Sequence, residues 1–135
     1  MHRWVLTIIG LLYLALGGWC AAFPETTAQS LGYQLSSAGV VEYVVVYGGL
    51  EVGLGLGILI GARHPLLFPG VFFMTSLFSL CLPVFRGVMM WLYGSSATLW
   101  WLLGGEILIV LLLAACVLFS RRDVVSAATS EARDD

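Results

Sequence analysis

Four long apolar runs, separated by short polar segments, dominate the hydrophobic pattern of the chain. The runs cover residues 4–23, 40–62, 66–93 and 97–119. An α-helix needs about 20 apolar residues to cross the hydrocarbon core of a bilayer. The pattern therefore predicts an all-α fold, an integral membrane four-helix bundle whose four-span transmembrane domain covers residues 1–120.

The composition indicates a membrane protein and limits the classes of partner that it can bind. Of the 135 residues, 60% are hydrophobic and 10% are charged, whereas a soluble domain has about 25% charged residues. The lipid bilayer is thus the predicted partner of most of the surface. The net charge of −2, with no basic patch to neutralise phosphates, predicts no nucleic-acid partner. Residues 121–135 are polar and are predicted to form a disordered cytoplasmic tail.

The placement of arginine predicts the orientation of the chain. Arg3 precedes the first run, Arg63 follows the second, and Arg121 and Arg122 follow the fourth, whereas the other two connections carry no basic residue. Basic residues favour the cytoplasmic side, so both termini are predicted to be cytoplasmic. The chain has six basic residues, all arginine, a bias typical of GC-rich bacterial genomes. The predicted location is the bacterial inner membrane.

The second run carries a regular stripe of glycines. Gly49, Gly53, Gly57 and Gly61 follow one another at four-residue intervals, which places them on one face of a helix as a glycine zipper. Small residues let helix backbones approach closely inside lipid, where the hydrophobic effect does not drive association. The stripe predicts helix packing, either within one chain or between two protomers of a homo-oligomer.

Four ionisable residues, Glu42, Glu51, Arg86 and Glu106, lie inside the apolar runs. A charge at the centre of a bilayer costs at least ~2.5–3.5 kcal/mol, so such residues usually have partners. A helix rises about 1.5 Å per residue, which places Glu51, Arg86 and Glu106 at similar depths. A guanidinium can hold two carboxylates. We therefore predict a Glu51–Arg86–Glu106 cluster that joins three helices.

Two tyrosines extend this predicted polar cluster. Tyr43 and Tyr47 precede Glu51 by two turns and one turn of helix, which stacks the three side chains on one face. Glu42 is shallower and is expected to contact water. The cluster either fixes the order of the helices or lines a pocket open to the outer leaflet or the periplasm. No cofactor is predicted, and no metal site is predicted because cysteine and histidine show no ligand spacing.

The segment from Tyr47 to Gly55 has the pattern YGGxExGxG, and Arg86-Gly87 and Glu106 follow it along the chain. These residues together resemble a bacterial family of small four-helix membrane proteins of unknown function, which is DoxX-like in overall plan. The resemblance implies four spans and suggests that Glu51, Arg86 and Glu106 belong to a shared pattern. It implies no particular activity.

Three functions are compatible with the sequence. The first is a non-enzymatic accessory or interaction subunit, with a membrane protein partner, a second copy or a lipid-like ligand. The alternative is a membrane enzyme for an isoprenoid or sterol-like substrate, in which Glu51 or Glu106 transfers a proton and Arg86 stabilises negative charge. The second alternative is an oligomeric proton or cation transporter subunit.

Overall fold

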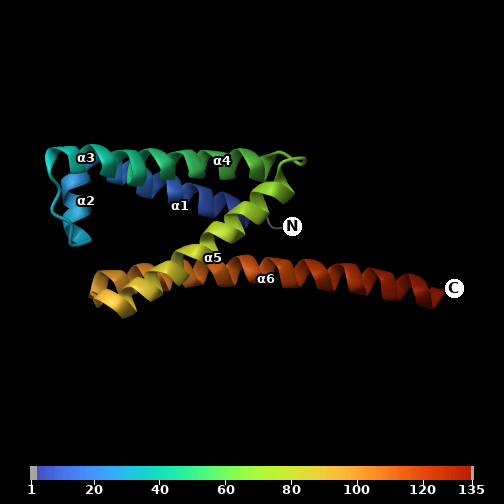
Figure 1. Ribbon diagram of the computed structural model, residues 1–135. Helices are drawn as coiled ribbons and strands as arrows, with labels where there is room; N and C mark the ends of the chain where they lie inside the picture. The colour runs from blue at the N-terminus through green and yellow to red at the C-terminus, as the bar shows by residue number, and fades with distance from the viewer. Residues whose placement is uncertain (1–2, 135) are drawn as a thin grey trace.

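The computed structural model describes residues 3–134, and the side chains of residues 3–118. Within these residues the chain is helical and contains no strand (Figure 1). The helices, in order, are α1 (Arg3–Ala22), α2 (Pro24–Ser30), α3 (Ser37–Tyr43), the π-helix η1 (Val44–Leu50), α4 (Glu51–Arg63), α5 (Phe68–Tyr93) and α6 (Ala97–Asp134).

Four helical segments are long and apolar enough to cross a membrane. They are Arg3–Ala22, Ser37–Arg63, Phe68–Tyr93 and Ala97–Leu118. The second combines α3, η1 and α4 in one continuous rod. The prediction of an all-α chain with four candidate spans is confirmed, and the span boundaries agree with the predicted ones to within a few residues.

Local sequence signals explain where the helices begin and end. Pro24 occupies the first turn of α2, where its missing N–H is not needed. Ser36 caps α3, because its hydroxyl accepts a hydrogen bond from the Gly39 N–H at 3.2 Å. Gly94 ends α5 with a φ of +93°, a conformation that favours glycine.

Helix α6 differs from the prediction beyond its membrane-spanning part. A disordered tail was expected from residue 121, whereas the backbone stays helical to Asp134. Residues 121–134 contain no glycine or proline and include three alanines. Nothing in this stretch therefore interrupts the hydrogen-bond ladder that α6 propagates from the apolar span.

The four spans form two antiparallel pairs that meet at one end. Helix α1 lies along the rod of α3, η1 and α4, and α5 packs against α6. In Figure 1, α5 runs obliquely from the end of α4 to the start of α6, so it diverges from α4 along its length. The buried apolar core lies where the two pairs meet, near the 64–67 connection, and comprises Val5, Leu6, Ile9, Ile58, Ala62, Leu113 and Cys116.

Close packing of α1 against η1 and α4 uses glycines other than the predicted stripe. A Cβ added at Gly55 would lie 2.8 Å from the carbonyl oxygen of Gly10, and one added at Gly17 would lie 2.9 Å from the carbonyl oxygen of Gly48. The two helix backbones are therefore in direct contact at these points. Gly10 and Gly17, like Gly48 and Gly55, are seven residues apart, which places each pair on one helix face.

Within the chain, the glycine stripe packs closely at only one of its four positions, and its predicted packing between protomers stays a prediction. Among the described residues, a Cβ added at Gly53 or Gly57 would meet no atom within 4 Å, and one at Gly49 would meet only a backbone oxygen of its own helix. Gly61 alone packs closely, against Val71 of α5. The physical reason is that α1 occupies the other face of this rod, so the stripe is left facing the diverging helix α5.

Candidate functional site

Helices α5 and α6 are joined by an ion pair inside the apolar segments. The Nη2 of Arg86 lies 2.6 Å from Oε1 of Glu106. The Nε of Arg86 donates to Oε1 at 3.0 Å and to Oε2 at 2.9 Å. This fork-like geometry is the favourable one for a guanidinium and a carboxylate, and the predicted contact between Arg86 and Glu106 is present.

Glu51 does not join this pair, so the predicted three-residue cluster is not formed. Its Oε2 is buried and accepts no hydrogen bond from any residue that the structure describes. The reason is geometric: the Cβ of Glu51 lies 2.9 Å from a Cβ built on Gly17, so this side chain begins against α1. The donors of Arg86 are directed at Glu106 on the neighbouring pair of helices.

The predicted tyrosines form an aromatic cluster with a third member. Tyr43 and Tyr47 stack with ring centroids 4.7 Å apart. Tyr33, from the connection between α2 and α3, packs on both rings at 6.4 and 6.5 Å. The hydroxyl of Tyr43 also lies 3.6 Å from the Cys20 sulfur on α1. Glu42 is exposed, and its predicted contact with water stays a prediction.

Helix α5 carries a polar face, formed by Thr75, Ser79 and Arg86, that the sequence analysis did not predict. Thr75 and Ser79 are both buried, and they lie on the same side of the helix as Arg86. The Oγ of Ser79 has no hydrogen-bond partner among the described residues. The sequence signal was the spacing of 75, 79 and 86, which is one turn followed by two turns of an α-helix.

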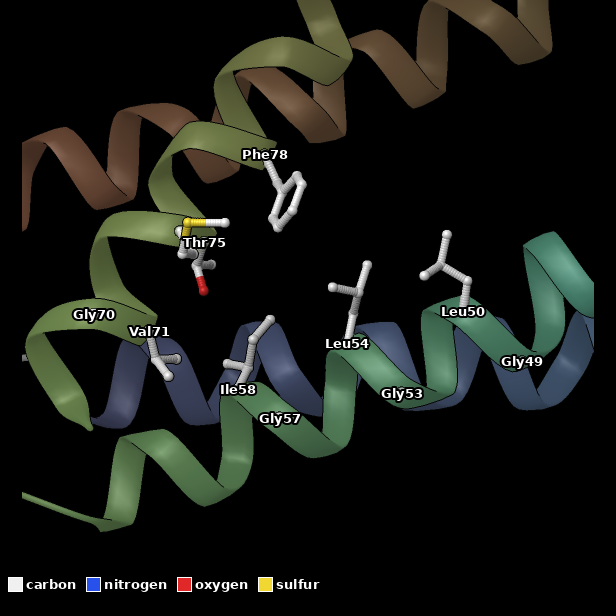
Figure 2. Close-up of a pocket in the computed structure, with 11 residues that line it drawn as sticks. Gly49, Leu50, Gly53, Leu54, Gly57, Ile58, Gly70, Val71, Thr75 and Phe78 are labelled. Atoms are coloured by element: carbon white, nitrogen blue, oxygen red, sulfur yellow. The ribbon is translucent and has the colours of Figure 1, made fainter. Parts of the chain in front are cut away.

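An apolar groove separates the glycine stripe from helix α5 (Figure 2). Its volume is about 440 Å³. Figure 2 shows the side chains of Leu50, Leu54 and Ile58 directed toward α5, with the glycines on the ribbon beneath them. The groove is lined from η1 and α4 by Gly49, Leu50, Gly53, Leu54, Gly57 and Ile58, and from α5 by Gly70, Val71, Met74, Thr75 and Phe78.

The groove is open toward the outside of the helix bundle. Leu50 is 57% exposed and Phe78 is 44% exposed, and both lie within segments that are long and apolar enough to span a membrane. Thr75 has the opposite character, since it lines the groove but is only 4% exposed. The groove thus combines an open apolar mouth with one recessed hydroxyl group.

The intramembrane charges and the groove are separate features of the molecule. Glu51, Arg86 and Glu106 are not among the residues that line the groove. Among residues 3–118, no group of three His, Cys, Asp or Glu side chains is placed to hold a metal ion. The groove can therefore hold an apolar molecule and offer it one hydrogen bond from a side chain.

Comparison of the chain with protein-family models, with curated proteins and with solved structures finds no match. The resemblance to a bacterial family of small four-helix membrane proteins, DoxX-like in overall plan, therefore stays a prediction.

Proposed function

We propose that the protein is a non-enzymatic accessory membrane protein, and that it binds a lipid-soluble molecule in the groove between α4 and α5. The observation that carries this proposal is the groove itself, about 440 Å³ in volume and lined almost entirely by apolar groups. Binding sites for small molecules are concave, measure about 300–1,000 Å³ and contain few polar groups. The groove fits this description.

The position of the groove explains why the molecule would be lipid-soluble. Its exposed rim, at Leu50 and Phe78, belongs to two candidate spans. A molecule dissolved in the hydrocarbon could enter sideways without crossing a polar layer. Gly53 and Gly57 present no side chain to it, so the occupant could lie against the helix backbone.

The charged residues support a structural role better than a catalytic one. The Arg86–Glu106 pair is satisfied internally by three short donor–acceptor contacts. An acid, base or oxyanion-stabilising group must reach the reacting atoms, and none of the three predicted charged residues lines the groove. We assign the pair to holding α5 against α6.

We further propose that the chain lies in a bacterial inner membrane with both ends in the cytoplasm. Arg3 and Arg63 lie at the same end of the helical spans, because Arg63 precedes the 64–67 connection and the Arg3 guanidinium lies 5.9 Å from the ring of Phe68, which follows it. Basic residues favour the cytoplasmic side. In Figure 1, α1 begins and α6 ends on the same side of the molecule. The groove would then widen toward the opposite leaflet.

Native mass spectrometry after gentle detergent extraction tests the ligand proposal. The wild type should retain a small molecule, which the Gly53→Leu variant should lose because leucine fills the groove. Gly104→Leu is the matched control, since Gly104 is also an open glycine of a candidate span but lies on α6 outside the groove. A wild type free of small molecules, or equal retention by all three proteins, would contradict the proposal.

A second candidate function is favoured by the open glycine stripe. Gly53 and Gly57 have no neighbour within 4 Å of an added Cβ, and such faces are common contact sites between transmembrane helices. In this case the groove would receive a helix of a membrane protein partner or of a second copy. The same spectra separate the two functions, because the Gly53→Leu variant would then lose a protein mass.

A further inference from the structure

Thr75 differs from three other hydroxyl residues in the helices of this chain, Thr7, Thr27 and Ser76. The hydroxyls of Thr7, Thr27 and Ser76 each donate to the carbonyl oxygen four residues earlier, at 2.8–2.9 Å. This is the usual way in which a hydroxyl inside a helix is satisfied. Among the described residues, no hydrogen bond joins the Thr75 hydroxyl to any partner, although Thr75 is only 4% exposed.

The Thr75 hydroxyl is directed into the groove. Figure 2 shows its oxygen on the side of α5 that faces Ile58 and Leu54. A hydroxyl without a hydrogen-bond partner is unfavourable in apolar surroundings, and inside a bilayer no water is at hand to pair with it. A molecule that fills the groove and brings a hydrogen-bonding group to this depth would remove that cost.

We infer that Thr75 anchors the single polar group of the lipid-soluble ligand, which is an apolar chain that carries one hydroxyl or carbonyl, such as an isoprenoid alcohol. This inference rests on the proposed function. The rest of the lining consists of four glycines and six apolar side chains. The groove therefore offers no partner to a second polar group of the ligand.

The same geometry disfavours two other occupants. A saturated acyl tail has no group that could bond to the Thr75 hydroxyl. A second copy of this chain related by two-fold symmetry would bring its own Thr75, but that side chain is equally recessed at 4% exposure. Two recessed hydroxyls cannot reach one another across an interface, so the groove is better matched by a slender molecule.

Binding of farnesol and of farnesene to the purified protein tests the inference. The two probes share an isoprenoid chain, but only farnesol has a hydroxyl. A neutral hydrogen bond contributes about 0.5–1.5 kcal/mol, so the wild type should bind farnesol roughly two- to tenfold more tightly than farnesene. Thr75→Val should reduce this preference to about one, and Thr75→Ser should restore it. The affinity for farnesene should not change in either variant.

The variants distinguish failure of the inference from failure of the proposed function. If Thr75→Val keeps the preference for farnesol while Gly53→Leu loses both probes, the groove binds the chain but Thr75 does not anchor it, and the inference is overturned. If Gly53→Leu binds both probes as the wild type does, the groove is not the site and both proposals fail. Gly104→Leu should bind both probes normally, because Gly104 lies outside the groove.

Discussion

Individual polar residues inside the apolar segments fall into two groups. Arg86 and Glu106 satisfy one another through three contacts of 2.6–3.0 Å. Glu51 and Ser79 each have a buried oxygen with no partner among the described residues, and Thr75 turns its hydroxyl into the groove. The Arg86–Glu106 pair joins two helices, whereas only Thr75 of the unpaired groups lines the groove.

The ion pair should contribute measurably to the stability of the α5–α6 contact. Hydrogen bonds to charged groups contribute about 1.5–3 kcal/mol, so a double-mutant cycle of Arg86→Met and Glu106→Gln should give a coupling energy in that range. The measurement is reversible unfolding in mixed micelles. Arg63→Met is the control partner, because Arg63 lies outside the pair at the end of α4, and its coupling to Glu106→Gln should be close to zero. A coupling energy below about 0.5 kcal/mol for the Arg86 cycle would show that the pair does not stabilise the contact between α5 and α6.

At the residue scale, the sequence predicted the contact between Arg86 and Glu106, but it predicted the wrong surroundings for Glu51. Depth along each helix follows from a constant rise, and it placed Arg86 and Glu106 at matching levels. Rotation about the helix axis does not follow in the same way when the neighbouring helix is unknown. Glu51 was therefore assigned to Arg86, although it packs beside Gly17 of α1.

Among the elements, the rod of residues 37–63 has one face that packs against α1 and another that lines the groove. Gly48 and Gly55 face α1, where the backbones touch. Gly53 and Gly57 face the groove, where nothing touches them. The π-helix η1, Val44–Leu50, lies just before Glu51, and single π-helical segments often occur near functional sites. This rod thus connects the packed side of the molecule with the open one.

Alanine at these glycines should have opposite effects. Gly55→Ala places a methyl group 2.8 Å from the Gly10 carbonyl oxygen, and overpacking of this kind costs about 1–3 kcal/mol. Gly57→Ala meets no neighbour and should gain up to about 1 kcal/mol from its higher helix propensity. Unfolding in mixed micelles measures both. Equal destabilisation by the two substitutions would show that α1 does not occupy the face that carries Gly55.

The elements themselves were the most predictable part of the fold. Long apolar runs and their polar boundaries depend on composition, which the sequence shows directly. The glycines that pack against α1 were not predicted. Four glycines at four-residue intervals, from Gly49 to Gly61, form a more conspicuous pattern than two glycines that are seven residues apart. Gly10 with Gly17, and Gly48 with Gly55, become recognisable as partners only when α1 is known to lie against α4.

In the whole molecule, two helix pairs are held together mainly at one end. The buried core gathers near the 64–67 connection, and α5 leaves α4 as it runs toward α6 (Figure 1). The groove exists because of this divergence. Such an arrangement could not be predicted from apolar periodicity, because lipid-facing and partner-facing residues are equally apolar inside a membrane.

The central claim is that a lipid-soluble molecule occupies the space between α4 and α5. The most direct test is photolabelling of the purified protein with a diazirine analogue of farnesol, followed by peptide mapping. We predict labels within residues 49–58 and 70–78, which unlabelled farnesol suppresses. Labels that gather instead on lipid-facing positions of α6, such as the exposed Trp101 and Leu108, and that unlabelled farnesol does not suppress, would contradict the claim.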